Sequence, residues 1–199
     1  MLFPPKHPYF KAPEKAKQII DEIKDRREEN FKLYQKLKND PDYFDVEYDH
    51  ISGGVKAIHK DHNFDTTKGI FNIPRGEYER NAVKALFRKG YSIILKSEVA
   101  PAGEKCPDGY LNEVLMDIKG IEHGNPLYAM KRANEQEVKT VVLYYHDKTD
   151  YKRDVVKLKF ETLPEWINKQ NYIKDKTIHL KKIVCVIRHN NNSYDVEEI

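Results

Sequence analysis

Apolar residues recur at helical spacing between residues 76 and 90. Ala82, Val83 and Leu86 would share one face of a helix, since they lie one, three and four positions apart. Gly90 follows the basic residues of the last turn, and glycine at this place commonly ends a helix. The pattern therefore predicts an amphipathic helix whose apolar stripe packs on a core.

Three further segments have the pattern of β-strands. Residues 91–96 and 140–145 are apolar runs of the kind found inside a sheet, and residues 114–119 alternate between two faces. Residues 126–138 have inward-facing positions at helical spacing. With a turn near residues 111–113, the predicted order is helix, strand, strand, strand, helix, strand, which indicates an α/β fold with a central mixed sheet flanked by helices.

The first fifty residues differ from this pattern. Residues 13–40 combine dense mixed charge with apolar residues at nearly helical spacing, and Pro13 suits a first helical turn. Residues 40–49 are acidic and aromatic, which we interpret as a linker. We therefore expect an N-terminal helical appendage with its linker (residues 1–49) and an α/β domain (residues 50–199). The charged helix would pack on the core, self-associate or join the domain to a carrier.

The alternating strand carries the most informative polar residues. Its period of two places Asp117 and Lys119 on one face, opposite the apolar positions. Asp108 would return beside them if the chain turns between Asp108 and Asp117. Two carboxylates can hold a hard cation such as Mg²⁺, and a nearby lysine can orient or activate water for phosphodiester hydrolysis. The alternative is an amphipathic strand with a solvated polar face.

A third carboxylate is predicted on the first central helix. Glu79 lies three positions before Ala82 and seven before Leu86, so it shares the buried face, whereas Glu77 does not. A carboxylate on a core-facing stripe is costly to bury without a partner, which makes Glu79 the better candidate for a site. The alternative is that both acids only favour the positive end of the helix dipole.

These residues resemble a known nuclease motif. Pro107 and Asp108 followed by Asp117-Ile118-Lys119 resemble the signature of the PD-(D/E)xK superfamily, and the element order resembles its restriction-endonuclease-like core. The resemblance covers about residues 53–188 and extends to the C-terminal nuclease domains of contact-dependent-inhibition toxins, many of which cut tRNA. Asp117 departs from the commoner Glu. The resemblance implies metal ligands and catalytic residues at Glu79, Asp108, Asp117, Lys119 and Gln136, with the first three holding the metal.

The resemblance also implies a function. It predicts a metal-dependent endonuclease that acts on RNA, with tRNA favoured, in a toxin-like or mobile-element context. Mg²⁺ is the expected cation, with Mn²⁺ and Zn²⁺ as alternatives. Nucleic acid is the expected partner, with RNA favoured over DNA, together with an immunity or carrier protein.

Other functions stay open on the sequence alone. One is an inactive nucleic-acid-binding or phage-type structural module, and another is an accessory protein of a mobile element. A third is a metal-independent RNase with a barnase-, EndoU- or RelE-like fold. In that case His59 or His62 would be the first candidates for a general acid or base, because histidine titrates near neutral pH. Otherwise we expect these histidines at the surface or in contact with substrate.

Composition argues against a membrane-spanning protein and against a small disulfide-rich domain. The chain has 199 residues, of which 34% are charged, and its mean hydropathy is −0.79. No segment approaches the roughly 20 apolar residues of a membrane span, so we expect no membrane span and a cytoplasmic protein, or one delivered within a larger toxin or phage system. Two cysteines are too few for a disulfide framework, and Cys185 is expected to be a buried thiol.

Basic residues concentrate toward the C-terminus. The net charge is only +3, but eleven Lys or Arg accompany five Asp or Glu between Lys148 and Arg188. Interleaved aromatic residues suit base stacking, so we predict that this region forms one wall of a nucleic-acid cleft. An alternating strand over residues 156–160, with Lys157 and Lys159 exposed, is the alternative. The residues expected to contact substrate are Lys174, Lys176, Lys181, Lys182 and a ring at Tyr172 or Trp166.

Overall fold

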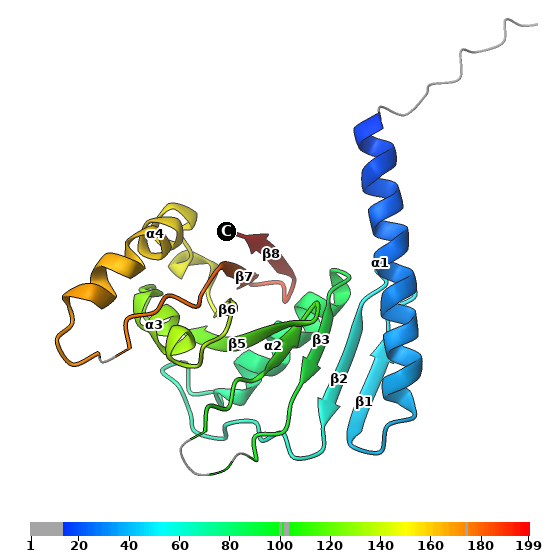
Figure 1. The fold of residues 1–199 in the computed structure, drawn as a ribbon, viewed down its shortest axis with the longest axis horizontal. Coiled ribbons are helices and arrows are strands. Elements are labelled where there is room, and N and C mark those ends of the chain that lie inside the picture. Colours follow the sequence, from blue (N-terminus) through cyan, green and yellow to red (C-terminus); the bar gives the residue numbers. More distant parts are fainter. Residues whose placement is uncertain (1–13, 100, 102–103, 174) are drawn as a thin grey trace, which may run out of the picture.

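The computed structural model describes residues 14–99, 101, 104–173 and 175–199 (Figure 1). Pro13 and Lys174, on which two predictions drew, lie outside the described residues. The elements in chain order are α1 (Glu14–Lys38), β1 (Tyr43–Tyr48), β2 (Val55–His59), α2 (Gly76–Arg88), β3 (Ser92–Leu95), β4 (Gly109–Leu111), β5 (Val114–Ile121), α3 (Leu127–Glu135), β6 (Thr140–Tyr145), a 3₁₀ turn (Lys148–Asp150), α4 (Arg153–Lys169), β7 (Lys182–Arg188) and β8 (Tyr194–Glu198). The predicted order of six central elements is confirmed, running from α2 to β6.

All eight strands form a single mixed sheet in which neighbours in sequence are neighbours in space. The pairs β2–β3, β5–β6 and β6–β7 are parallel, and α2, α3 and α4 respectively connect their strands. Parallel neighbours need such a crossover, because the chain must return to the starting edge of the sheet. The other four pairs are antiparallel. The predicted α/β class with a central mixed sheet is confirmed.

Helices cover both faces of the sheet. The apolar stripe of α2, including Ala82 and Leu86, packs on one face against β3, β5 and β6. α3 and α4 cover the opposite face over β5 to β7, and α1 lies on that same face over β1 and β2. Every residue of β6 is buried, as expected for a strand covered on both sides. β5 is also covered on both sides, so its Asp117 face is not the solvated surface that an isolated amphipathic strand would present.

The predicted linker is wrong. Residues 40–49 contain β1, which pairs antiparallel with β2 at the edge of the sheet. The aromatic residues of this segment have a packing role instead, since Tyr43 and Tyr48, together with Val46, pack against the cluster formed by α1 and β2. The sheet therefore runs across the predicted boundary between residues 49 and 50.

The predicted N-terminal helix is present over residues 14–38, but only part of its apolar stripe is buried. Leu37 is 5% exposed and packs on β1 and β2, whereas Ile19 and Ile20 are each 48% exposed. Figure 1 shows why, because the N-terminal half of α1 extends past the sheet. Asn30, near the middle, anchors the helix by donating a hydrogen bond to the carbonyl oxygen of Gly53 at 2.7 Å.

Residues 156–160 are helical, so the alternative of an alternating strand is wrong. They lie within α4, whose buried residues are Val156, Leu163 and Ile167. Leu163 lies seven residues after Val156 and Ile167 four residues after Leu163, which is the spacing of one helix face. This helical pattern extends over most of α4, whereas the alternation that suggested a strand covers only residues 156–160. Lys157 and Lys159 accordingly belong to a helix.

Two remaining predictions concern cysteine and membranes. Cys185 on β7 is a buried free thiol, as predicted, and Cys106 is a half-buried free thiol. Among the helices that the structure describes, none combines the length and the apolar character needed to cross a membrane.

Candidate active site

A tight hairpin brings two carboxylates together. Asn112 and Glu113 form the two-residue turn between β4 and β5, with φ of 46° and 65°, as a type I′ turn requires. This turn pairs Gly109 with Met116, so the next position outward places Asp108 opposite Asp117. The Asp108 Oδ2 atom accepts a hydrogen bond of 2.5 Å from the backbone N–H of Ile118. The chain therefore returns Asp108 to the polar face of β5, as its sequence position predicts.

Lys119 completes a close group of three charges. Its Nζ atom lies 2.6 Å from Asp117 Oδ2 and 3.9 Å from Asp108 Oδ2. The side chain of Asp117 is 1% exposed and that of Lys119 is 28% exposed. The ammonium therefore covers the buried carboxylate and remains accessible from outside.

Burial and the charges of neighbouring carboxylates raise the pKa values of Asp108 and Asp117. Burial raises the pKa of Asp117 to about 7, and the neighbouring Asp108 contributes to this rise, while Lys119 opposes it. Burial also raises the pKa of Asp108, and the nearby Glu79 adds to that rise. For Lys119, burial acts to lower the pKa, but the two aspartates outweigh it and the pKa is raised. The site thus has one ammonium for several carboxylates and would be stabilised by a further cation.

Glu79 reaches the same place from the first turn of α2. Its side chain is 14% exposed, and its Oε1 atom lies 2.8 Å from Nε2 of His62. Glu77 is 43% exposed on the outer side of the helix and pairs with Arg80 at 2.6 Å. The structure thus places Glu79 at the cavity described below and leaves Glu77 outside it.

His62 is buried, so the expectation of a surface or substrate-contacting histidine is wrong for this residue. Its side chain is 0% exposed, and Nδ1 lies 2.9 Å from the carbonyl oxygen of Lys96. Burial acts to lower the pKa of His62, but the contact with Glu79 outweighs it and the pKa is raised. A ring enclosed in this way can orient Glu79 but cannot touch a substrate. This arrangement does not suit His62 as the general acid or base of a metal-independent RNase.

Gln136 does not point into the site. α3 ends at Glu135, and Gln136 caps it. Its Oε1 atom accepts a hydrogen bond of 3.1 Å from the backbone N–H of Cys106, two residues before Asp108. Gln136 therefore holds the segment that carries Asp108, which is a positioning contact and not the direct role implied by the resemblance.

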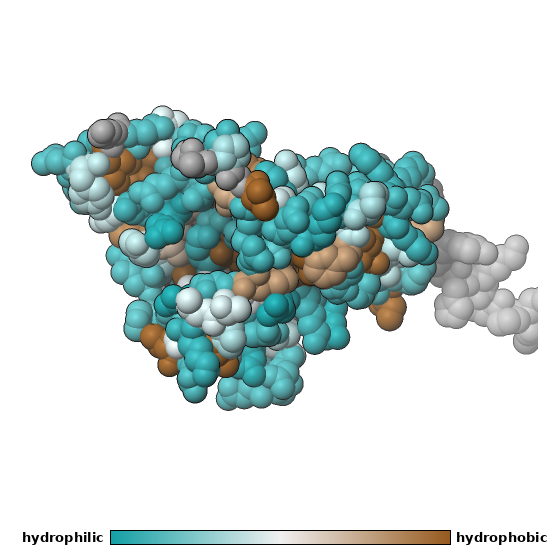
Figure 2. Space-filling model, turned by 90° about the horizontal axis from the view of Figure 1, so that it is seen from below, coloured by the Kyte–Doolittle hydropathy of each residue, from teal (hydrophilic) through white to brown (hydrophobic). Residues whose placement is uncertain are grey.

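A cavity of about 960 Å³ opens over these residues. Figure 2 views the molecule from below and shows a hollowed, mainly hydrophilic face. Residues of α2, β5 and α3 line the cavity, and Asp117 lies just beneath its wall. Its charged lining residues include Glu79, Glu98, Asp108, Lys119, Glu122 and Arg132.

Three acids that line this cavity, Asp65, Glu98 and Glu122, have no counterpart in the predicted site. Glu122 lies just past the end of β5 and has the parity of Met116 and Ile118, so the period of two places it on the side covered by α2 and not with Asp117 and Lys119. It pairs with Arg75 at 3.3 Å and accepts a hydrogen bond from Tyr78. Glu98 follows β3 in an irregular segment, and no periodicity of the sequence points to it.

The predicted wall of the cleft is wrong for this cavity. None of the described residues between Lys148 and Arg188 lines it. Lys182 pairs with Glu198 at 2.8 Å, and Lys181 donates to a backbone carbonyl group, so these charges are engaged elsewhere. Trp166 packs against the core under α4, and Tyr172 is 65% exposed but lines a separate cavity of about 270 Å³.

The donor set of the site fits a hard divalent cation. Asp117 Oδ2 and Glu79 Oε1 are buried oxygens without a hydrogen bond of acceptable geometry, although the Lys119 ammonium lies 2.6 Å from the first and the His62 ring nitrogen Nε2 lies 2.8 Å from the second. Such under-satisfied carboxylate oxygens are ligands that Mg²⁺ or Mn²⁺ accepts, whereas Zn²⁺ prefers nitrogen and sulfur ligands. Asp108, Asp117 and Glu79 are therefore the residues that would hold the predicted metal, although among the described residues their ligand atoms do not converge within 4.8 Å as those of a second group, described next, do.

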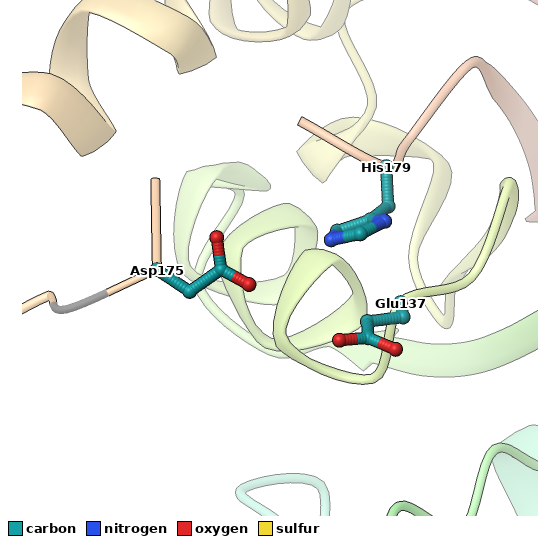
Figure 3. Close-up of side chains that lie close together, drawn as sticks. All are labelled: Glu137, Asp175 and His179. Carbon is teal, nitrogen blue, oxygen red and sulfur yellow. The ribbon is translucent and has the colours of Figure 1, made fainter. Parts of the chain in front are cut away.

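A second group of ligand-type side chains lies apart from this site. Glu137, Asp175 and His179 converge so that one potential ligand atom from each lies within 4.8 Å of the others (Figure 3). Both acids are exposed, and Glu137 already pairs with Lys105. This group alone does not indicate a metal.

Comparisons with known proteins provide no relative. No protein-family model, curated protein or solved structure matches the chain. The likeness to the PD-(D/E)xK nucleases accordingly depends on the motif and the order of elements. The mixed sheet establishes the α/β class but does not by itself establish a restriction-endonuclease-like core.

Proposed function

We propose that the protein is a divalent-metal-dependent nuclease with a restriction-endonuclease-like core. The observation that carries this proposal is the convergence of Asp108, Asp117 and Lys119 at the β4–β5 hairpin. Asp108, Lys119 and Glu79 line one cavity, and Asp117 is buried beneath it. Buried like charges are costly and need a compensating partner. Strongly perturbed carboxyl groups that line a cleft are typical of functional sites.

Each residue of the site has a defined role in this proposal. Asp108, Asp117 and Glu79 hold the cation, which when bound would polarise the phosphoryl group and favour formation of hydroxide from water. Lys119, fixed by Asp117 at 2.6 Å, orients the attacking water and neutralises charge that develops on the phosphate. Gln136 fixes the backbone that leads to Asp108.

RNA is the proposed substrate, with tRNA as the first candidate. This choice comes from the resemblance to the nuclease domains of contact-dependent-inhibition toxins, since the metal site itself is indifferent to the sugar. The same resemblance leads us to propose delivery within a larger toxin or mobile-element system, with an immunity or carrier protein as partner.

The proposal is tested by a cleavage assay on tRNA, unstructured RNA and duplex DNA, with Mg²⁺ or with EDTA. We expect cleavage of RNA only with the metal, and a loss of about 10²-fold or more in Lys119→Gln, because a charge acting at the transition state is removed. Lys157→Gln on α4 is the matched control, since Lys157 is 62% exposed and remote from the cavity. Undiminished cleavage in EDTA, or equal rates in the two variants, contradicts the proposal.

A further inference from the structure

A second groove adjoins the candidate active site. It has a volume of about 560 Å³ and lies between α2 and strands β1 and β2, of which β1 is the edge strand. Phe64 lines both the groove and the cavity of the candidate site, so the two adjoin at this residue. The buried ring of His62 lies beneath the groove and contacts Glu79 of the candidate site.

A row of basic residues follows α2 along this groove. Arg80, Lys84 and Arg88 lie four residues apart, which places them on one helix face over about 12 Å at 1.5 Å per residue. The row begins next to Glu79 and leads away from the candidate site. Lys84 and Arg88 are exposed, and neither forms an ion pair with any of the described residues.

The groove has an excess of positive charge. Five basic residues line it, against Asp45 and Glu47 as the only acidic lining residues among those described. Both acids pair with Lys56, at 2.8 and 2.9 Å, so they do not neutralise the row on α2. Lys60 pairs with Asp42 and Arg80 with Glu77, so the unpaired positive charge comes from Lys84 and Arg88. The charge of Lys84 and Arg88 is therefore available to a ligand.

Aromatic rings lie beside these charges. Phe44 on the edge strand β1 is 50% exposed and lines the groove opposite α2. The guanidinium group of Arg80 lies 4.0 Å from the ring centre of Phe64, at the junction with the candidate site. A basic row with exposed rings is the combination by which proteins bind single-stranded nucleic acid, since the cations contact phosphates and the rings stack on bases.

We propose that this groove binds a single-stranded stretch of RNA that flanks the bond to be cut. Lys84 and Arg88 contact backbone phosphates, and Phe44 stacks on a base. The proposal rests on the proposed nuclease function, because it is the connection with the candidate active site that makes the bound strand a substrate. It also moves the substrate surface from the C-terminal basic region, expected from sequence, to α2 and β1.

The test is binding of a fluorescein-labelled single-stranded RNA, measured by anisotropy over a range of salt concentrations. Asp117→Asn is the background, so that no cleavage occurs. Lys84→Gln/Arg88→Gln is compared with Lys157→Gln/Lys159→Gln, which removes the same charge from α4. A duplex RNA of the same sequence serves as a second probe.

We expect weaker binding and a flatter salt dependence only in the α2 variant. Each phosphate contact on a single strand contributes roughly 0.7 to the slope of log K against log salt, so two lost contacts lower it by about 1.4. Between about 50 and about 200 mM salt, the parent would then lose about sevenfold more affinity than the α2 variant. Phe44→Ala should weaken binding without changing the slope.

Equal affinity and slope in the two double variants would overturn the groove proposal, as would tighter binding of the duplex. This failure is separable from failure of the nuclease proposal. If the protein is a nuclease but the groove does not bind RNA, the wild-type protein and Lys84→Gln/Arg88→Gln should cleave RNA equally well in Mg²⁺. If the groove binds RNA but the protein is not a nuclease, the α2 variant should lose RNA binding, and no divalent cation should support cleavage by the wild-type protein.

Discussion

Asp117→Asn should stabilise the metal-free protein while abolishing its function. Asp117 is 1% exposed and lies beside Asp108. Burial and the charge of Asp108 together raise the pKa of Asp117 to about 7. Asparagine has nearly the same shape without the charge, so it removes the repulsion and leaves Lys119 paired with Asp108. A substitution at a functional site that increases stability is expected where the native residue is kept for chemistry.

The magnitude follows from the pKa. A pKa of about 7 in the folded state, against the ordinary value of 3.8, corresponds to a cost of about 4 kcal/mol for the ionised form. The contact with Lys119 is lost in the variant and the amide must find partners, so we expect about half of this, roughly 2 kcal/mol. For a chain of this size that gain corresponds to a rise in Tm of about 4–8 °C.

The dependence on pH has a defined sign. Because the folded pKa lies above the ordinary value, the stability that protonation of Asp117 provides is fully present below about pH 4 and is lost as pH rises through about 7. The difference in Tm between Asp117→Asn and wild type should therefore be greatest at about pH 8 and should disappear near pH 4.

The assay is thermal unfolding followed by circular dichroism, in EDTA and in Mg²⁺ or Mn²⁺ at matched ionic strength. A cation at 100 times its Kd stabilises the wild type by about 2.7 kcal/mol, or about 5–11 °C, and should leave Asp117→Asn unchanged. Glu77→Gln, an exposed site of the same charge change, is the control and should retain the full shift. An equal or lower Tm of metal-free Asp117→Asn at pH 8, or an equal metal shift in both proteins, would refute the reasoning.

Two further predictions separate the roles of neighbouring residues. In a kinetic cleavage assay, Glu79→Gln should lower the cleavage rate by about 10²-fold or more, because Glu79 lines the cavity. Glu77→Gln should cleave at nearly the wild-type rate, since Glu77 lies outside the cavity. The reverse pattern would assign the site to the other face of α2. Asn134→Ala should cost roughly 2–4 kcal/mol in urea unfolding, because buried Asn134 bonds the backbone of Thr177, His179 and Leu180 and its loss leaves those groups unpaired. Exposed Asn191→Ala is the control, and a cost below about 1 kcal/mol would show that the segment repairs its own hydrogen bonds.

Local patterns predicted the central part of the fold. The helical stripe of Ala82 and Leu86 and the apolar run of β6 are strong signals over whole elements, and both elements form as expected. The sequence predicted that Asp108 and Asp117 meet if the chain turns between them, and the two-residue turn at Asn112 and Glu113 meets this condition. The phase of α2 also separated Glu79 from Glu77 correctly in space.

Long-range packing decided the features that local patterns missed. Residues 40–49 were interpreted as a linker because they are acidic and aromatic. Their pattern does not reveal that Tyr43, Val46 and Tyr48 pack against the cluster formed by α1 and β2. His62 lies in an irregular segment, and only the approach of α2 and β3 makes it a buried neighbour of Glu79. The excess of lysine near the C-terminus indicated a binding surface, but the fold places those residues outside the cavity of the candidate site.

The central claim is that Asp108, Asp117 and Glu79 hold a divalent cation, and diffraction from crystals soaked in Mn²⁺ tests it most directly. We expect an anomalous-scattering peak within about 2.0–2.2 Å of an oxygen of Asp108 and of Asp117, with Glu79 within direct or water-mediated reach, and no such peak in Asp117→Asn. A crystal that binds Mn²⁺ only at Glu137, Asp175 and His179, or nowhere near the β4–β5 hairpin, would contradict it.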